Sequence, residues 1–208
     1  CKIYGQHWHI WEENGRLVFQ DENGLLDLPL PKLIGAHQIQ NAGIALATLR
    51  YLGKENSSFE GAMLNADWPA RMQRLRKGIL TSLAPSAEIW LDGGHNKAAG
   101  YALSEAVGRL QSRKLFLIVG MLNTKDIMGY MKPLLSRSTN LYGVSIPGEA
   151  ATMTAEETVK IARDVGFEAV ISEDVESAIR DIIKQDDKAR ILICGSLYLA
   201  GNILQKNS

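Results

Sequence analysis

The sequence predicts an α/β fold in which a Rossmann-like, mostly parallel sheet is flanked by helices and preceded by a smaller unit of short strands and helices. Short apolar runs alternate with helical patterns from residue 79 onward, which is typical of strands joined by crossover helices. Several of these runs are apolar at every position, as expected for strands covered on both faces. The chain has 208 residues, 46% of them hydrophobic and 22% charged, which is ordinary for one or two globular domains.

The first part of the chain is expected to form a small sheet followed by two helices. Runs between residues 3 and 30 mix aromatic and β-branched side chains, and Asn14-Gly15 is a typical hairpin turn. Apolar residues then recur at helical spacing over 36–52. A shorter helix is expected over 58–66, with a serine at its N-cap.

Trp68-Pro69 interrupts the pattern, so we divide the chain into domains 1–66 and 67–208. The second domain is expected to alternate strands and helices. The expected strands are 89–91, 115–119, 141–146, 169–171 and 191–194, and the expected helices are 97–110, 125–135, 155–165, 175–184 and 197–204. In a parallel sheet, ligands lie beyond the carboxyl ends of the strands. The loops 92–96, 120–126 and 195–196 are therefore the expected site.

Composition narrows the function classes. The 23 Lys and Arg offset the 23 Asp and Glu, so the overall charge favours neither a nucleic acid nor an anionic membrane as partner. No run approaches the length of about eighteen apolar residues that a membrane span needs. Cys1 and Cys194 make no disulfide framework, which favours a reducing, cytoplasmic compartment.

The loop after the first strand of the second domain is the most informative. Asp92 follows the strand directly, and a carboxylate there can accept hydrogen bonds from ribose hydroxyls. His95 could bind a carboxylate or transfer a proton. The structural alternative is an Asx-turn at Asp92 with Asn96 as the cap of the next helix. The residues by themselves leave both interpretations open.

Four further residues each have a functional and a structural interpretation. Ser196 opens the last helix, where it would help to bind an anion or simply cap the helix. Asn41, within the first helix, would bind a purine edge or face solvent. Arg71 would clamp a phosphate or belong to a solvated basic turn with its neighbour Arg74. Lys125 would contact a phosphate or remain exposed beside the residue that follows it.

Two kinds of site are not indicated by any motif. His7 and His9 alternate as on one strand face, but a metal site needs more ligands than these two offer, so no metal site is expected and both are assigned structural roles. The phosphate-binding loop pattern G-x-x-x-x-G-K-[ST] occurs nowhere in the sequence.

Taken in order, however, the motifs resemble those of the folylpolyglutamate synthase/dihydrofolate synthase family, which belongs to the Mur ligase superfamily. Residues 37–42, H-Q-I-Q-N-A, resemble the family's H-Q-x-x-N-A helix. Residues 68–73 resemble its W-P-G-R-x-[QE] boundary, and 91–96 resemble its L-D-G-A-H-N. Residues 195–201, G-S-L-Y-L-A-G, are similar to its G-S-L-Y-L-[AV]-G, and 120–126 look like its segment ending in K-D.

The resemblance implies an ATP-dependent ligase. ATP would phosphorylate a carboxylate of folate or dihydropteroate, and the amino group of L-glutamate would attack the acyl phosphate. By the family pattern, Asn41 would contact the adenine of ATP, Asp92 the ribose and Arg71 the phosphates. His95 and Ser196 would hold the incoming glutamate. Mg²⁺ would offset the phosphate charge, with its ligands expected in sequence upstream of this chain.

Three departures from the family pattern stand out. Ala70 replaces the usual glycine, and Gly94 replaces the usual alanine. Lys97 stands where proline is common, which adds a positive charge beside the implied glutamate site.

The resemblance also implies which part of the family's architecture is present. Residues 1–66 resemble the tail of the central, ATP-binding domain, and 67–208 resemble the complete C-terminal glutamate-ligase domain. The chain lacks an initiator methionine and a phosphate-binding loop. We therefore expect it to be the C-terminal part of such a ligase and to be inactive alone.

Two alternatives remain. A Mur-type amino-acid ligase of cell-wall synthesis would use the same chemistry on a nucleotide-linked substrate. A stand-alone nucleotide- or amino-acid-binding module would need no phosphate loop. The sequence does not distinguish a dihydrofolate synthase from a folylpolyglutamate synthase, nor does it determine the oligomeric state.

Overall fold

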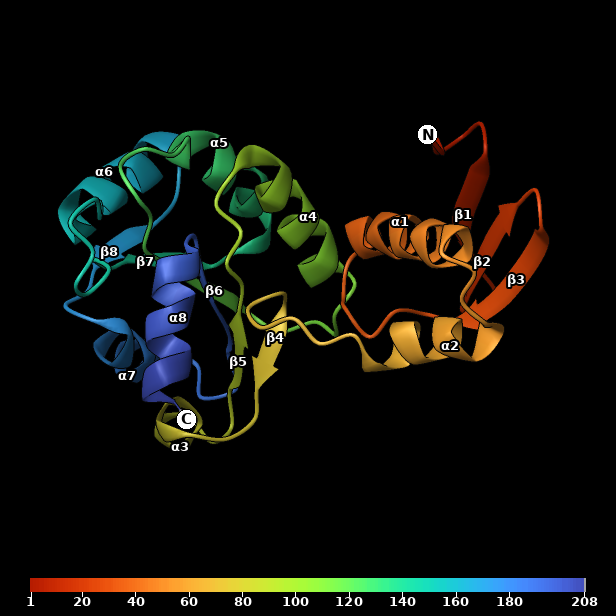
Figure 1. The fold of residues 1–208 in the computed structure, drawn as a ribbon. Helices are drawn as coiled ribbons and strands as arrows, with labels where there is room; N and C mark the ends of the chain where they lie inside the picture. The colour runs from red at the N-terminus through yellow and green to blue at the C-terminus, as the bar shows by residue number, and fades with distance from the viewer. Residues whose placement is uncertain (208) are drawn as a thin grey trace. The chain divides into compact units, whose positions relative to one another are not determined.

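The computed structural model describes residues 1–207, without the side chain of Asn56. It divides into two compact units, Cys1–Trp68 and Pro69–Ser208, which are coloured red to orange and yellow to blue in Figure 1. The division falls after Trp68 rather than after residue 66. Among the described residues, no helix is both long and apolar enough to span a membrane.

The first unit contains a three-stranded antiparallel sheet of β1 (Trp8–Glu13), β2 (Arg16–Asp21) and β3 (Gly24–Pro29). Asn14 and Gly15 join β1 to β2 with φ values of 51° and 75°, so the predicted hairpin is confirmed. Apolar side chains of the sheet and the two helices form one buried core. Its members are Trp8, Ile10, Leu17, Phe19, Leu26, Leu28, Ala42, Leu46, Phe59 and Met63.

The two helices of this unit are α1 (Ala36–Tyr51) and α2 (Asn56–Asn65). A Cβ on Gly43 would lie 2.4 Å from Trp8 Cζ3, so glycine allows α1 to approach the sheet closely. The expected serine cap of α2 is wrong. That helix begins after Glu55, whose extended backbone makes no side-chain capping bond.

The second unit is built on a six-stranded sheet with the order β4-β5-β9-β6-β7-β8. The strands are β4 (Gln73–Leu75), β5 (Glu88–Leu91), β6 (Leu115–Val119), β7 (Asn140–Gly143), β8 (Ala169–Ile171) and β9 (Arg190–Cys194). All neighbouring pairs are parallel except β4 and β5, which are antiparallel. The predicted fold class is confirmed, and the short edge strand β4 is an addition that the sequence pattern did not predict.

Helices cover both faces of this sheet (Figure 1). They are α3 (Ile79–Leu83), α4 (Lys97–Gly108), α5 (Ile127–Met131), the 3₁₀ helix η1 (Lys132–Arg137), α6 (Ala155–Val165), α7 (Val175–Gln185) and α8 (Leu197–Lys206). One buried cluster joins the sheet to α3, α7 and α8, and the other joins it to α4, α5, η1 and α6. Along β9, Ile191 and Ile193 belong to the first cluster and Leu192 and Cys194 to the second. This alternation explains why the strand is apolar throughout.

Two predicted elements of the second unit need correction. The helix expected over 125–135 is a five-residue α-helix followed by a 3₁₀ helix that has proline in its first turn. Proline has no N–H for an α-helical bond to an earlier carbonyl, so it favours a change of helix type there. The strand expected over 141–146 is four residues long and ends at Gly143.

Candidate functional site

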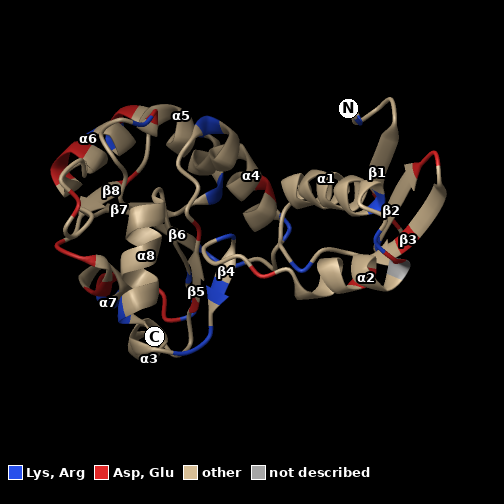
Figure 2. Cartoon of the chain, viewed as in Figure 1, with Lys and Arg blue, Asp and Glu red and all other residues tan. Residues whose placement is uncertain are grey.

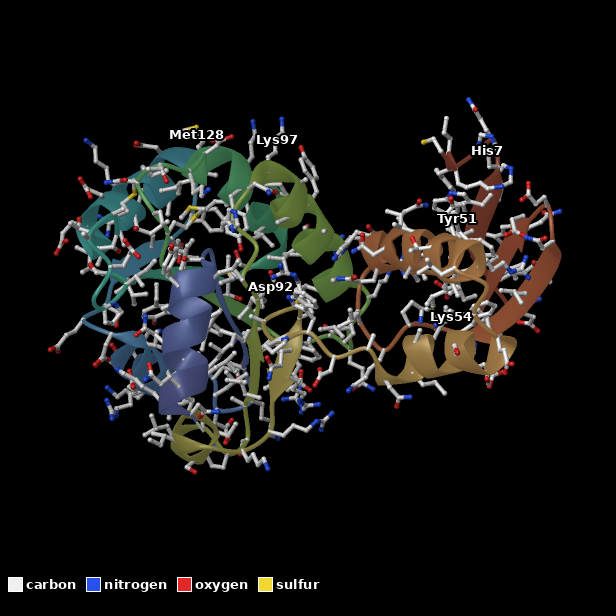
Figure 3. All side chains as sticks on the ribbon, viewed as in Figure 1. His7, Tyr51, Lys54, Asp92, Lys97 and Met128 are labelled. Carbon is white, nitrogen blue, oxygen red and sulfur yellow. The ribbon has the colours of Figure 1, made fainter. Side chains whose placement is uncertain are left out.

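The three loops expected to form the site do lie at one edge of the second unit's sheet. β9 lies between β5 and β6. Backbone hydrogen bonds between the neighbouring segments continue past the ends of these strands. The N–H of Asp92 donates to Ile193 O at 3.0 Å, and the N–H of Gly120 donates to Cys194 O at 3.3 Å. Figure 3 labels Asp92 at the end of β5 and Lys97 at the start of α4.

Asp92 is the centre of this edge. It is 6% exposed, and each carboxylate oxygen accepts a backbone bond. Met72 N–H donates to Oδ2 at 2.8 Å, and Gly94 N–H donates to Oδ1 at 2.7 Å. The Asx-turn is therefore present, and so is the Asn96 cap, which accepts from Ala99 N–H at 2.9 Å. Asp92 therefore ties the turn at Met72 to the loop at Gly94.

Arg71 lies in a tight turn that Asp92 holds in place. Its neighbours Ala70 and Met72 have φ values of 56° and 43°, a region that L-residues adopt at a cost. Ala70 stands where the family pattern given above has glycine. The positive φ at this position explains a preference for glycine, which has no Cβ. The turn is secured by Gly93 N–H, which donates to Ala70 O at 2.9 Å.

The Arg71 side chain is half-buried and donates from Nη1 to Ala70 O at 3.1 Å. Among the described residues it forms no ion pair with a carboxylate. Its neighbour Arg74 differs, since its guanidinium lies 3.3 Å from Glu88 Oε1. The two neighbouring arginines of the sequence, Arg71 and Arg74, thus have different surroundings in the structure. Arg71 lies beside the Asp92 loop, and Arg74 is paired on β4, which is partly blue in Figure 2.

His95 is half-buried, and its Nδ1 lies 3.1 Å from Gly93 O. A carbonyl oxygen only accepts, so Nδ1 carries the proton and Nε2 is left for another partner. A neutral Nε2 accepts from an ammonium group, and a protonated one donates to a carboxylate. Both are chemistries that an amino-acid substrate offers.

Ser196 is 3% exposed and caps the ten-residue helix α8. Its Oγ accepts from Tyr198 N–H at 3.1 Å, and its own proton remains available to donate. The preceding Gly195 has φ of 106°, and a Cβ there would lie 2.9 Å from Gly120 O. Glycine at this position brings the start of α8 against the loop after β6.

Two buried groups beneath these loops were not singled out by the sequence. The Tyr130 hydroxyl has no hydrogen-bond partner among the described residues. Burial raises the pKa of Tyr130 well above its ordinary value of 10.0, and nearby Cys194 and Asp92 raise it further. Burial also raises the pKa of the Cys194 thiol to about 12, so it is protonated and a poor nucleophile at neutral pH. No sequence pattern indicates that the tyrosine of this short helix is buried near Asp92 and Cys194.

Lys125 lies in the loop after β6, and its side chain is exposed. It directly precedes Asp126, whose Oδ1 accepts from Gly129 N–H at 2.9 Å and caps α5. No ion pair joins Lys125 to a carboxylate within residues 1–207. The loop is the expected one, and a phosphate contact by Lys125 remains a prediction.

The remaining predicted residue, Asn41, belongs to the first unit and lines a pocket of about 440 Å³. Its exposed amide donates from Nδ2 to Gln38 Oε1 at 3.0 Å. Two further amide residues, Gln38 and Asn65, line the pocket, and the other lining residues are apolar or small: Pro31, Leu33, Ala42, Ala45, Gly61, Ala62, Met63 and Ala66. A mostly apolar pocket with a few amide side chains suits a flat heterocycle such as a nucleobase.

Metal ligands are not gathered in the part of the chain that the structure describes. No group of three or more His, Cys, Asp or Glu side chains is arranged to hold an ion there. His7 Nδ1 accepts from Ile3 N–H at 3.0 Å, and His9 is an exposed residue of β1.

Comparisons with known proteins agree on one family. Residues 80–206 match the family described as dihydrofolate synthetase, C-terminal domain. The folylpolyglutamate synthase of Lacticaseibacillus casei is 26% identical over 95% of this chain and 44% of its own length. The dihydrofolate synthetase of Saccharomyces cerevisiae is 26% identical over 99% of this chain and 52% of its own length. The chain thus spans about half the length of the curated relatives it matches.

Solved structures show the same relationship. Escherichia coli FolC in complex with DHPP and ADP is 26% identical and covers 97% of this chain, with a TM-score of 0.79 and 46% of that chain matched. A bifunctional folylpolyglutamate synthase/dihydrofolate synthase with Mn, AMPPNP and L-glutamate bound is 25% identical over 97% of this chain and 46% of its own, with a TM-score of 0.77. The relationship therefore extends over both units.

Proposed function

This chain belongs to the dihydrofolate synthetase C-terminal domain family, and on that premise we propose that it is the C-terminal part of an ATP-dependent ligase. The ligase joins L-glutamate to a carboxylate of folate or dihydropteroate. The resemblance inferred from the motifs is confirmed by the family match over residues 80–206. The names of the relatives support the substrates, since they are folylpolyglutamate and dihydrofolate synthases.

The observation that carries the proposal is the double backbone anchor of Asp92. Its two oxygens bond to the N–H groups of Met72 and Gly94, so one carboxylate holds the Arg71 turn against the His95 loop. In this assignment the Asp92 carboxylate accepts from the ribose hydroxyls of ATP. Arg71 contacts the phosphates, and the Asn41 amide in the first unit contacts the adenine.

The glutamate site is assigned to His95 and Ser196. The free Nε2 of His95 would accept a hydrogen bond from the amino group of glutamate or, when protonated, donate to a carboxylate. The Ser196 hydroxyl and the N–H groups that begin α8 would donate to a glutamate carboxylate. Lys97, exposed at the start of α4, adds positive charge near that loop, which favours an acidic substrate.

The chemistry follows from the weakness of a carboxylate as an electrophile. A substrate carboxylate oxygen attacks the γ-phosphorus of ATP, and ADP leaves. The glutamate nitrogen then attacks the acyl carbon, inorganic phosphate leaves and the nitrogen loses a proton. Arg71 would offset negative charge on the phosphates during transfer.

A divalent metal would supply further charge compensation, and the named relative has Mn bound. The described residues of this chain do not fit a metal site, since they offer no group of three ligands. The sequence also holds no G-x-x-x-x-G-K-[ST] loop. We therefore propose that the metal ligands, here expected to hold Mg²⁺, and the phosphate loop belong to another part of the ligase, and that this chain is inactive alone.

The proposal is tested by titrating ADP, adenosine and L-glutamate into the 208-residue chain and following residue-resolved NMR shifts. ADP is expected to shift the Asn41 side-chain amide, and L-glutamate the His95 and Ser196 signals. Arg71→Gln should weaken ADP about tenfold, because a charged phosphate contact is lost, and leave adenosine binding unchanged. Arg76→Gln is the matched control, since Arg76 is an exposed arginine of the same segment.

Three results would contradict these assignments. If L-glutamate changes the NMR shifts of no residue in 92–96 or 195–201, the assigned glutamate site is wrong. If Arg71→Gln and Arg76→Gln weaken ADP binding equally, the assigned contact between Arg71 and the phosphates is wrong. ATP-dependent ligation of glutamate to dihydropteroate by the chain alone would disprove its inactivity.

A stand-alone binding module is the second candidate, and the missing phosphate-loop motif favours it. It predicts that ADP and adenosine bind with equal affinity, because no group would be dedicated to the phosphates. The Arg71→Gln titration therefore separates the two candidates.

A further inference from the structure

Gly93 is the residue at which several parts of the candidate site of the second unit meet. Its N–H donates to Ala70 O at 2.9 Å, next to Arg71 in the chain. Its carbonyl oxygen lies 3.1 Å from His95 Nδ1. On the side where other residues carry a Cβ, the Arg71 guanidinium and the Leu197 side chain approach it. The residue assigned to the phosphates and a residue assigned to glutamate therefore reach the same glycine.

Leu197, the first residue of α8, comes close to Gly93 because glycine has no side chain. A Cβ on Gly93 would lie 3.1 Å from Leu197 Cγ and 3.3 Å from Arg71 Nη1, so a larger residue would displace one of these groups. Leu197 is nevertheless 46% exposed, whereas Leu199 and Ile203 of the same helix are buried. Leu197 thus presents an open apolar surface beside a guanidinium group.

The proposed reaction determines which part of the substrate lies over this surface. In an acyl phosphate, a single oxygen joins the phosphorus to the acyl carbon, and the glutamate nitrogen approaches that carbon to about 3 Å before it attacks. With the phosphates at Arg71 and glutamate at His95 and Ser196, the acyl carbon lies between these residues. Leu197 directly follows Ser196 in the chain and contacts Gly93 beside Arg71. Its side chain is therefore within reach of the group that the acyl carbon carries.

We infer that Leu197 is a specificity-determining residue that contacts the group attached to the reacting carboxylate, so that the site favours an acyl donor in which this group is apolar. In dihydropteroate the group is an aromatic ring. The inference rests on the proposed function, which assigns the phosphates to Arg71 and glutamate to His95 and Ser196. It adds a contact to the acyl donor, for which the proposed function names no residue of this chain.

A single exposed aliphatic side chain is ordinary on a protein surface, so the placement of Leu197 carries the argument. Ile79 provides the comparison, since it is 59% exposed in the same unit. It lies near the opposite end of α8, because the residue that follows it, Leu80, donates its N–H to Asn207 Oδ1 at 3.0 Å. An acyl group placed between Arg71 and Ser196 would contact Leu197 and leave Ile79 untouched.

The experiment compares two amides of L-glutamate that differ only in their acyl group, N-acetyl-L-glutamate and N-benzoyl-L-glutamate. Each is titrated into the 208-residue chain beside L-glutamate itself, and the signals of 92–96 and 195–201 are followed by NMR. We expect the benzoyl compound to bind about tenfold more tightly than the acetyl compound, because its ring buries more apolar area. In Leu197→Ala this ratio should fall to about two. Nuclear Overhauser effects should join the benzoyl protons to the Leu197 methyl groups.

Two further variants separate a lost contact from a disturbed fold. Leu197→Met keeps an apolar side chain of similar volume and should retain the wild-type ratio. Ile79→Ala shortens an exposed aliphatic side chain away from the site and should also retain it. L-glutamate, which has no acyl group, should bind all three variants as tightly as it binds the wild type.

The outcomes distinguish this inference from the proposed function. If L-glutamate binds at 92–96 and 195–201 but the two amides bind equally, the inference is wrong and the glutamate site stands. If L-glutamate changes the signals of neither segment, the glutamate assignment is wrong and the inference fails with it. A tenfold preference that survives in Leu197→Ala, or that falls equally in Ile79→Ala, would contradict the inference alone.

Discussion

The two units of this chain hold their candidate site residues by different means. In the second unit, backbone N–H groups anchor the key side chain, since Asp92 bonds to Met72 and Gly94. In the first unit, Asn41 is held by another side chain, Gln38. The loops at the strand ends of a parallel sheet have backbone N–H groups that can donate to a side chain. Inside a helix, the N–H groups already donate to carbonyl oxygens of the same helix. The site on the sheet is therefore part of the fold, and the site on the helix is separable from it.

The largest expected effect comes from breaking the anchor in the second unit. Asp92→Ala leaves the N–H groups of Met72 and Gly94 without partners and should lower the free energy of unfolding by about 4 kcal/mol. Urea denaturation followed through the Trp90 signal measures this. Asp126→Ala, which removes an exposed helix cap, should cost only about 1 kcal/mol. Equal losses would remove the distinction between the two kinds of aspartate.

A glycine pair tests how tightly the sheet edge is built. Gly195→Ala places a Cβ 2.7 Å from Met121 Cγ in a backbone with φ of 106° and should destabilise the second unit by about 3 kcal/mol. Gly53→Ala also has positive φ, 67°, but nothing lies within 4 Å of its Cβ, and about 1 kcal/mol is expected. Thermal unfolding of both variants supplies the comparison, and a larger loss at Gly53 would contradict it.

Acid should weaken the second unit through Glu88, which lies at the opposite edge of the sheet. Desolvation by burial raises the pKa of Glu88, but its bonds to Arg190 and Trp90 and the charge of Arg74 bring it below the ordinary 4.5. A carboxyl whose pKa is lower in the folded state stabilises the fold above its unfolded pKa, and that contribution is lost as the pH falls through the folded value.

Glu88→Gln should therefore cost about 2 kcal/mol at pH 7, where it leaves Arg190, 4% exposed, without its carboxylate. The difference from wild type should shrink below pH 4.5. Urea midpoints of both proteins across that range measure the change. A difference that stays constant with pH would show that Glu88 acts through packing rather than charge.

The smallest effect on stability is expected in the first unit. Gln38→Leu removes one partner of the exposed Asn41 amide and should cost about 1 kcal/mol. Hydrogen exchange of the α1 amides measures the cost. A loss as large as that of Asp92→Ala would mean that the helix site is not separable from the fold.

The elements that local chemistry specifies were predicted well. The helix expected over 155–165 is α6, Ala155–Val165, where Thr154 and Glu157 form a capping box and Gly166 ends the helix in the left-handed region. Elements that depend on distant partners were not. β4 is three residues long and exists because β5 pairs with it, which no local pattern reveals.

The sequence by itself determined the alternation of strands and helices, the family motifs and the loops at the carboxyl edge. Apolar periodicity and chain order are local properties, and the end of a parallel strand is a predictable place for a ligand. Only the tertiary structure decided that Asp92 accepts from the N–H of Met72, that the Tyr130 hydroxyl is buried, and that Gln38 accepts from Asn41. Each of these depends on which groups meet in space, and a hydrogen bond forms only when a donor and an acceptor are brought within about 3 Å of each other.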